Sequence, residues 1–453
     1  MKLFEDFSRL KIDFSSLDSD RLLYSYDASP HESKPLAVCW PESSSDLSKI
    51  VKYCSKQSLP VYPRGAGTAM TGSPLAVKPG IVVSFEKMRK ILEFSPENMM
   101  VTVQPGVITG ELKKFCLESG FYYPPDPASA SVCTIGGNLS TNAGGIRSLK
   151  YGTTRSYLLG LKYINHQGRE IILGTKNLRY ALGYPLHQLF CGAEGTLGLI
   201  SEITLRVIPA PLAFRTAYLG FRDLKLLTEF GFKFLPGRGI TPAILEFMDQ
   251  TCQKAVELRE KANWKRDNPY AVLIQLDGRS VEKIDGAWNM VRKFAGKNRL
   301  DFTESTDNGN EFLRWRKGLM SAFANLRPGV LGGDLVVPRA RLQDFVSKVE
   351  KLHSRFKVQF VLFGHIGDGN LHPNVLFSPD DKSEVTETKL LFAKLHAIAL
   401  DLGGAVSGEH GIGIERRGFL KKNLGKDAVN LMKEVKAIFD PQGIFNPGKI
   451  ISE

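Results

Sequence analysis

In the first half of the chain, short apolar runs alternate with segments whose apolar residues recur at helical spacing. Residues 36–40 and 60–62 predict strands. Residues 159–165 and 170–173 predict a hairpin, because a His-Gln-Gly turn separates them. Two helices are expected from apolar residues on one face, at Leu47, Ile50, Val51 and Cys54 and at Ile108, Leu112, Phe115 and Cys116.

The pattern changes after Pro209-Ala210-Pro211, where we expect a domain boundary. Residues 216–221, 243–247 and 270–276 predict strands, and helices are expected to begin at Asp223 and Val281. This order is typical of an antiparallel sheet that is backed by helices. Near the C-terminus, Asp440-Pro441 ends a helix that carries Val429, Met432, Val435, Ile438 and Phe439.

The composition is that of a globular protein. At 453 residues, with 43% hydrophobic and 24% charged residues, the chain predicts two or three packed units. It lacks an apolar run of about 18 residues, so we expect no membrane span. The N-terminus has no apolar signal sequence, which predicts a cytoplasmic protein. The six cysteines form no C-x-x-C pair, which argues against an iron–sulfur cluster and predicts free thiols.

The net charge of +13 admits several partners: nucleic acid, anionic lipid, an acidic subunit or an anionic substrate. The basic residues are spread along the chain, without a zinc-finger or RNP-type motif. We therefore expect no nucleic-acid binding.

Two glycine-rich segments indicate a site for a ligand with many acceptor atoms. Residues 64–72 combine three glycines with an arginine and two threonines, and residues 134–145 combine four glycines with asparagine and hydroxyl side chains. Glycines let backbone N–H groups approach an anion, and hydroxyl groups add donors. Neither segment matches a P-loop or the dinucleotide motif G-x-G-x-x-G. Together they suit an extended dinucleotide with a pyrophosphate.

Three of the eight histidines occur in two glycine-rich turns. Strands at 360–363 and 373–377 flank a Gly-Asp-Gly-Asn turn. If Ile366 lies opposite Leu371, then His365 faces His372 across the hairpin, at a spacing that suits two ligands of one metal ion. A second turn at 407–413 carries Glu409 and His410. Two histidines and a carboxylate would leave metal coordination positions open for a substrate.

Five segments in this order resemble the vanillyl-alcohol-oxidase superfamily, in the branch of D-lactate, glycolate and D-2-hydroxyglutarate dehydrogenases. They are Pro63-Arg64-Gly65-Ala66-Gly67-Thr68, Pro124-Pro125-Asp126-Pro127, residues 134–145, Tyr151-Gly152 and Gly192-Ala193-Glu194-Gly195-Thr196-Leu197-Gly198. The resemblance extends from about residue 34 to residue 450. It implies an α+β fold. An N-terminal segment (1–33) would precede a two-subdomain FAD-binding domain (34–211) and an antiparallel-sheet cap domain with helices and the metal hairpin (212–405). A C-terminal segment (406–453) would return to the flavin.

The resemblance also implies the cofactor site. The first loop would hold the pyrophosphate of FAD, residues 134–145 would line the flavin and its ribityl chain, and Gly195, Gly198 and Ile200 would follow the adenosine. Some relatives attach FAD through a histidine where this chain has Thr68, so we expect non-covalent FAD. The implied cofactor residues are Pro63, Arg64, Gly65, Ala66, Gly67, Thr68, Thr71, Gly72, Pro125, Asp126, Thr134, Gly136, Gly137, Asn138, Ser140, Thr141, Asn142, Gly144, Gly145, Gly195, Gly198, Ile200 and Asn446.

The G-H-x-G-D-G-N-L-H and S-G-E-H-G motifs of the family imply the chemistry. By resemblance, His365, His372 and Glu409 would bind a divalent metal, zinc or manganese, and His410 would be the general base. Arg316 would bind the substrate carboxylate. A solvated basic helix face is the alternative interpretation for Arg316, because Arg314 and Lys317 are its neighbours.

These expectations describe an FAD-dependent dehydrogenase that oxidises a small D-2-hydroxy acid to the 2-keto acid. Hydroxyglutarate enzymes carry a lysine shortly before the position of Asp334. This chain has Leu331-Gly332-Gly333 there, which favours D-lactate or glycolate over D-2-hydroxyglutarate.

Two other functions remain open: a non-redox flavoenzyme similar to alkyl-glycerone-phosphate synthases, and an electron-transfer subunit without chemistry of its own. The sequence does not name the electron acceptor. We expect an iron–sulfur partner subunit or a quinone, and a partner of this kind would place the protein at the periphery of the inner membrane.

Overall fold

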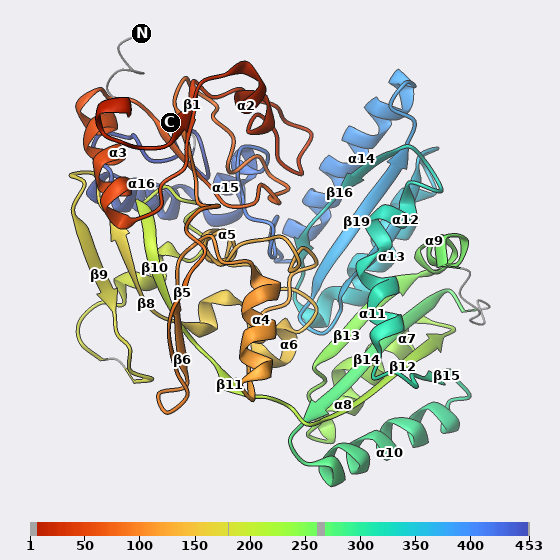
Figure 1. The fold of residues 1–453 in the computed structure, drawn as a ribbon. Helices are drawn as coiled ribbons and strands as arrows, with labels where there is room; N and C mark the ends of the chain where they lie inside the picture. The colour runs from red at the N-terminus through yellow and green to blue at the C-terminus, as the bar shows by residue number, and fades with distance from the viewer. Residues whose placement is uncertain (1–6, 180, 261–267, 452–453) are drawn as a thin grey trace. The chain divides into compact units, whose positions relative to one another are not determined.

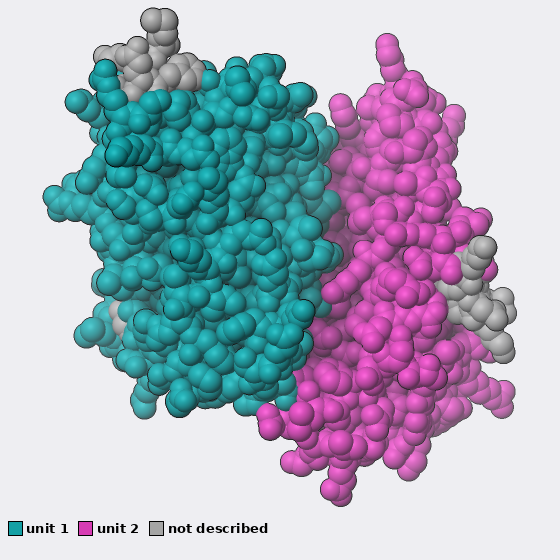
Figure 2. Space-filling model, viewed as in Figure 1, with its two compact units in different colours: residues 1–144, 153–210, 409–453 teal, residues 145–152, 211–408 magenta. Residues whose placement is uncertain are grey.

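The computed structural model describes residues 7–179, 181–260 and 268–451. The chain divides into two compact units, which Figure 2 colours separately. The first comprises Met1–Gly144, Thr153–Ala210 and Glu409–Glu453, and the second comprises Gly145–Gly152 and Pro211–Gly408. The domain boundaries expected from the sequence stay a prediction. The predicted α+β fold class, with an antiparallel sheet in the second unit, is confirmed.

The first unit holds a small, mainly parallel sheet of order β1-β2-β4-β3, of which β1 is labelled in Figure 1. Strand β4 (Ile81–Ser84) lies between β2 (Ala37–Cys39) and β3 (Val61–Arg64) and is parallel to both, while β1 (Phe14–Ser15) pairs antiparallel with β2. Helix α3 (Ser44–Lys56) buries the predicted face of Leu47, Ile50, Val51 and Cys54 in the same core cluster as β4.

A second sheet of the first unit is antiparallel throughout, with order β5-β6-β10-β8-β9. The predicted hairpin is its edge, and β10 occupies the centre. The strands are β5 (Ile91–Ser95), β6 (Met100–Val103), β8 (Leu158–Ile164), β9 (Glu170–Gly174) and β10 (Leu199–Arg206). The remaining α-helices and strands described in this unit are α2 (Asp18–Leu23), α4 (Thr109–Glu118), β7 (Phe121–Tyr122), α5 (Ile135–Thr141), β11 (Ile208–Pro209), α15 (Arg417–Leu424) and α16 (Lys426–Phe439).

The second unit is built on one large antiparallel sheet of order β15-β12-β14-β13-β18-β19-β16, with β17 also paired to β19. The strands are β12 (Ala213–Phe221), β13 (Ile244–Asp249), β14 (Tyr270–Gly278), β15 (Asp301–Glu304), β16 (Gly329–Gly332), β17 (Leu335–Val336), β18 (Gln359–His365) and β19 (Asn370–Phe377).

Helices cover both faces of this sheet. One face packs against α7 (Leu224–Glu229), α10 (Val281–Lys297), α13 (Leu342–His353) and α14 (Lys382–Asp401). The opposite face packs against α9 (Gln250–Glu260), α11 (Asn310–Lys317) and α12 (Leu319–Phe323). Because side chains alternate between the faces of a strand, Leu245 and Phe247 point to the first face, and Ile244 and Met248 to the second.

The predicted register of the histidine hairpin is wrong. His365 lies opposite Asn370, and His372 lies opposite Phe363, so the pairing is shifted by two residues from the expected one. The turn has the same length as predicted but begins one residue earlier, after His365. A shift of two residues keeps every side chain on its face, whereas a shift of one would have turned it over. Both histidines consequently remain on the same face as diagonal neighbours.

All six cysteines are buried free thiols, as predicted. Among the described residues, no helix is both long enough and apolar enough to cross a membrane.

Candidate functional site

The first glycine-rich loop leaves the end of β3 and packs directly against the second glycine-rich segment. A Cβ atom on Gly65 would lie 2.3 Å from Oγ1 of Thr134, and one on Gly195 would lie 2.2 Å from a side-chain carbon of Pro63. Both distances are below any real Cβ contact. Glycine at 65 and 195 therefore lets three predicted cofactor segments, far apart in the sequence, meet within the first unit.

The second segment begins helix α5. Thr134 caps this helix, since its Oγ1 accepts a hydrogen bond from the Gly137 N–H at 3.2 Å. Asn142 ends the helix in the left-handed conformation, with φ of 54°. Gly192 and Glu194 donate their backbone N–H groups to the carbonyls of Leu139 and Ser140 on the same helix. The helix thus binds the Gly192–Gly198 segment through its backbone.

Glu194 connects this segment to the C-terminal loop that carries His410. Its buried carboxylate accepts hydrogen bonds from the N–H groups of Ile412 at 2.6 Å and Gly413 at 2.9 Å. Burial raises the pKa of this carboxyl to about 7, although the two N–H groups oppose the shift. The hydroxyl of Thr71 donates to the His410 carbonyl at 3.5 Å. The C-terminal loop is therefore joined to two predicted cofactor segments.

Several predicted cofactor side chains are engaged by the protein itself. Arg64 lies beneath its loop and donates to the Tyr26 carbonyl at 2.8 Å, and Asp126 forms a 2.6 Å ion pair with Lys113. Asn138 donates to the hydroxyl of Thr109 at 2.7 Å, and Asn142 accepts from Thr153 and Arg155. At these positions the side chains are bound within the protein, and their contacts fix the conformation of the loops.

The predicted residue Asn446 carries a buried acceptor without a partner among the described residues. Its amide donates to the carbonyls of Ser73 and Glu194, at 3.0 and 2.5 Å. Its Oδ1 is buried and has no hydrogen-bond partner among the described residues. A buried acceptor of this kind is costly unless a ligand or a water donates to it. The glycine-rich loops and this orphaned acceptor fit a large polar cofactor. The other predicted cofactor residues also lie in the first unit, except Gly145, which begins the second unit.

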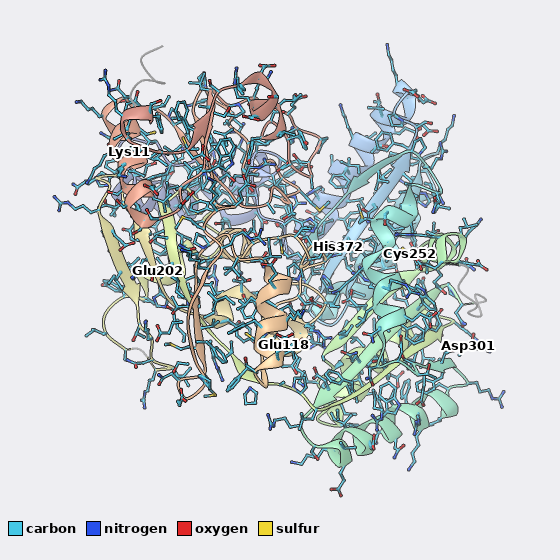
Figure 3. All side chains as sticks on the ribbon, in the orientation of Figure 1. Lys11, Glu118, Glu202, Cys252, Asp301 and His372 are labelled. Carbon is cyan, nitrogen blue, oxygen red and sulfur yellow. The ribbon has the colours of Figure 1, made fainter. Side chains whose placement is uncertain are left out.

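In the second unit, a group of buried polar side chains interrupts an apolar sheet face. His365 on β18 and His372 on β19 lie on the face that also carries Val361, Phe363 and Leu376. Figure 3 labels His372 in this sheet. The two Nε2 atoms are 3.4 Å apart. The sequence predicted this pair, and the structure brings it together despite the changed register.

The outer nitrogens of both rings face acceptors. Nδ1 of His365 lies 2.6 Å from Oε1 of Glu246, and Nδ1 of His372 lies 3.3 Å from the Gly333 carbonyl. A carbonyl only accepts, and so does an ionised carboxylate, so both Nδ1 atoms must carry the hydrogen. In neutral rings the Nε2 lone pairs then face each other. A proton or a cation between them removes the repulsion.

The donor set fits a divalent metal ion. Two imidazole nitrogens that each bind zinc at about 2.0–2.1 Å in a tetrahedral arrangement are about 3.3 Å apart. The observed 3.4 Å matches that spacing. Glu409 follows Gly408 directly in the chain, and Gly408 is held in the second unit by its N–H bond to Asp334 at 2.9 Å. Gly408 also packs against the side chain of Asn370 in the hairpin. Glu409, which carries the carboxylate, is the next residue in the chain.

Arg316, the predicted carboxylate ligand, is buried rather than solvated. It comes from α11, and its Nη2 atom lies 2.6 Å from Oε2 of Glu246, while its guanidinium carbon lies 4.5 Å from the centre of the Phe363 ring. Its Nε is buried without a hydrogen-bond partner among the described residues. The alternative of a solvated basic face applies to Arg314, whose side chain is 64% exposed, and not to Arg316.

Sequence reasoning missed two polar residues of this face. Glu246 is fully buried on β13, and Asn374 is buried on β19, two positions after His372. Oδ1 of Asn374 has no hydrogen-bond partner among the described residues. A polar residue inside an apolar strand was the available signal: Glu246 stands in Ile-Leu-Glu-Phe-Met.

Burial would raise the pKa of the Glu246 carboxyl, but the charges of His365 and Arg316 outweigh burial and hold this pKa below its usual value. Glu246 is therefore an anion inside the sheet, and it is shared by two predicted site residues.

Two family models match this chain, one over the part with the glycine-rich loops and one over the part with the histidine hairpin. Residues 35–174 match the FAD binding domain, and residues 210–450 match the C-terminal domain of FAD linked oxidases. The first match includes the glycine-rich loops, and the second includes the histidine hairpin. FAD is therefore a cofactor of this chain.

Similar proteins cover nearly the whole chain. The glycolate oxidase subunit GlcD of Bacillus subtilis is 34% identical, over 97% of this chain and 94% of its own length. A D-lactate dehydrogenase of Anaerostipes hadrus is 32% identical, over 92% of this chain and 90% of its own. A D-2-hydroxyglutarate dehydrogenase of Stutzerimonas stutzeri is also 32% identical, over 96% and 95%.

Among solved structures, p-cresol methylhydroxylase shares the fold, with a TM-score of 0.81 at 16% identity, over 97% of this chain and 94% of that chain. At that identity the likeness concerns the fold alone.

Proposed function

The chain belongs to the family of FAD-linked oxidases, and from this premise we propose that it oxidises a small D-2-hydroxy acid, D-lactate or glycolate, to the 2-keto acid. The observation that carries the proposal is the buried face of the second unit, where two imidazoles and an arginine gather beside one carboxylate. A 2-hydroxy acid offers a hydroxyl and a carboxylate, which are the two groups that such a set can bind. Relatives named for glycolate, D-lactate and D-2-hydroxyglutarate support the substrate class.

Bound FAD would accept the hydride that leaves the α-carbon. We propose that the FAD is not covalently attached, because the threonine at Thr68 offers no nitrogen for a bond to the flavin. The chain's contribution on this side is the set of backbone groups in the glycine-rich loops, together with Oδ1 of Asn446.

We propose that His365, His372 and Glu409 hold a divalent metal ion, which would lower the pKa of the substrate hydroxyl. His410 is then the general base that takes the hydroxyl proton. Its loop is fixed by Glu194 and Thr71, so the imidazole is presented from an ordered backbone. Arg316 binds the substrate carboxylate with its planar fork, for which its Nε is available.

The alternative substrate, D-2-hydroxyglutarate, is larger than D-lactate or glycolate. D-2-hydroxyglutarate has a second carboxylate, and burying it without a cation would cost several kcal/mol. Residues 331–333 supply no cation: Gly332 pairs with Asn374, and a Cβ on Gly333 would lie 2.8 Å from Pro373. D-2-hydroxyglutarate stays the second candidate, because the Stutzerimonas stutzeri relative is named for it.

The electron acceptor belongs to the same proposal. A relative named as a subunit supports a partner protein, and an iron–sulfur subunit or a quinone is the acceptor that we expect. The cytoplasmic location, with a partner holding the chain at the inner membrane, stays a prediction.

Anaerobic bleaching of the flavin absorbance tests the reaction. D-lactate and glycolate should bleach the flavin faster than D-2-hydroxyglutarate at equal concentration, and L-lactate serves as the stereochemical control. Arg316→Ala should weaken the preferred acid most. The matched control is Arg314→Ala, two positions away on the same helix but exposed. Failure of every D-2-hydroxy acid would refute the proposed activity, while faster bleaching by D-2-hydroxyglutarate would refute only the substrate preference.

A further inference from the structure

Glu246 is shared by a predicted metal ligand and the predicted carboxylate ligand. Its Oε1 lies 2.6 Å from Nδ1 of His365, and its Oε2 lies 2.6 Å from Nη2 of Arg316. Its side chain is 1% exposed, and those of His365 and Arg316 are 9% and 6% exposed. Burying a carboxylate at this depth is unfavourable unless both oxygens have partners. Here Oε1 is hydrogen-bonded to His365, while Oε2 has the charge of Arg316 beside it as an ion pair, without a well-oriented hydrogen bond among the described residues.

We propose that Glu246 is a positioning residue that orients His365 for metal binding and Arg316 for carboxylate binding at the same time. This inference rests on the proposed function, because it assigns Glu246 a task only if His365 binds a metal and Arg316 binds the substrate. Glu246 itself contacts neither the metal nor the substrate in this scheme.

Glu246 determines which nitrogen of the His365 imidazole carries the hydrogen. A carboxylate at Nδ1 keeps the hydrogen on that nitrogen and leaves the Nε2 lone pair directed at His372. It also makes the ring a stronger donor to a cation. Without it, the ring could carry its hydrogen on Nε2, and that tautomer cannot bind a metal through Nε2.

Glu246 also holds the guanidinium of Arg316 in place. One of its terminal nitrogens is held by Glu246, and its plane lies over the ring of Phe363. The guanidinium of an arginine is attached through a flexible chain of three methylene groups. Two anchors reduce its conformational entropy before the substrate binds, so less entropy is lost on binding a carboxylate. Nε of Arg316 stays without a partner among the described residues, which leaves a donor for the acid.

The sheet explains how one side chain can perform both tasks. Strand β13 pairs with β18 so that Phe247 lies opposite Gly364 and Met248 lies opposite Phe363. Extending this register by one residue places Glu246 opposite His365. The strand is also central, with β14 on its other side, so its backbone is fixed by two neighbours. Shortening or rotating the side chain would therefore break one contact in order to keep the other.

Metal affinity is the readout that separates this role from a purely structural one. We would strip purified, FAD-loaded protein with a chelator, titrate it with Zn²⁺ and with Mn²⁺, and measure bound metal and FAD content together. Glu246→Gln keeps the size but removes the charge, and it should weaken metal binding by about 10–100-fold, the usual loss when a supporting partner of a metal ligand is removed. FAD content should stay at the wild-type level, since the cofactor residues lie in other segments.

Two further variants complete the experiment. Glu304→Gln makes the same chemical change on β15 of the same sheet, where the side chain pairs with the exposed Arg292, and it should leave metal binding unchanged. Glu246→Asp keeps the charge but is too short to reach both partners, so its metal affinity should fall between those of wild type and Glu246→Gln. It replaces Glu246→Gln if that variant does not fold. At saturating metal, KM of Glu246→Gln for the acid should remain raised because Arg316 has lost an anchor.

The outcomes are distinguishable. If wild-type protein binds no metal and no acid bleaches its flavin, the proposed function fails and the role of Glu246 fails with it. If wild type binds metal and is reduced by acid, but Glu246→Gln or Glu246→Asp matches it in metal affinity and KM, only the positioning role is refuted.

Discussion

Replacing Gly65 with alanine should weaken FAD binding by disturbing the contact between the two glycine-rich segments. The new Cβ would lie 2.3 Å from Oγ1 of Thr134 but at an ordinary 3.5 Å from its Cβ. The hydroxyl must therefore move, and its cap bond to the Gly137 N–H is lost. Losing a cap costs about 0.5–2 kcal/mol, and the strain of an overfilled site about 1–3 kcal/mol. We expect Gly65→Ala to lower the free energy of unfolding by about 2–4 kcal/mol.

A double-mutant cycle makes this reasoning refutable. Thr134→Ala alone should cost about 1 kcal/mol, the typical value for a lost cap. It also removes the atom with which the alanine collides, so Gly65→Ala/Thr134→Ala should be little worse than Thr134→Ala. Two neighbouring residues that share a contact are expected to be non-additive in this way.

The assays for this cycle are chemical denaturation and FAD release followed by flavin fluorescence. Gly286→Ala on α10, where a Cβ would meet no atom within 4 Å, is the control and should stabilise slightly without affecting FAD. Additive costs in the cycle would show that the collision with Thr134 is not the cause.

Three other predictions concern the cofactor, the base and pH. Acid or heat should release free FAD from the purified yellow protein, and flavin that stays with the chain through denaturing electrophoresis would contradict non-covalent binding. His410→Ala should retain FAD and metal but slow anaerobic flavin reduction by about 10²–10⁴-fold, the usual range for a lost general base; an unchanged rate would remove His410 from the chemistry. Because burial raises the pKa of Glu194 to about 7, the folded chain retains a proton that the unfolded chain releases above the ordinary value of 4.5, so the contribution of this group to stability falls as pH rises from 4.5 to 7. Glu194→Gln should therefore gain stability relative to wild type across that range in calorimetric melts, and a constant difference would contradict the shift.

The sequence by itself determined the local features of this protein. Asp223 caps a helix at its predicted start, since its side chain accepts from the Leu226 N–H, and the strands at residues 36–40 and 60–62 occur as β2 and β3. These features depend on residues a few positions apart, and hydrophobic spacing and turn residues report on such neighbours directly. The face shared by His365 and His372 was also predictable, because the alternation of side chains along a strand survives a register shift of two. The family motifs added FAD as the cofactor, which the family model confirms, while the individual cofactor residues stay a prediction.

Only the tertiary structure decided which distant segments meet. Glu246 precedes His365 by 119 residues, and no local pattern relates them. They become neighbours because β13 pairs with β18 as well as with β14, the next strand in the chain. Arg316 illustrates the same limit, since its sequence neighbours suggested a solvated face, while the packing of α11 on the sheet buries it against Glu246 and Phe363. The exact hairpin register also escaped the sequence, because the position of the turn is set by backbone pairing along the whole of β18 and β19. Local periodicity specifies which face a side chain occupies, but the order of strands in a sheet is fixed by the burial of entire faces, and that is a property of the folded chain.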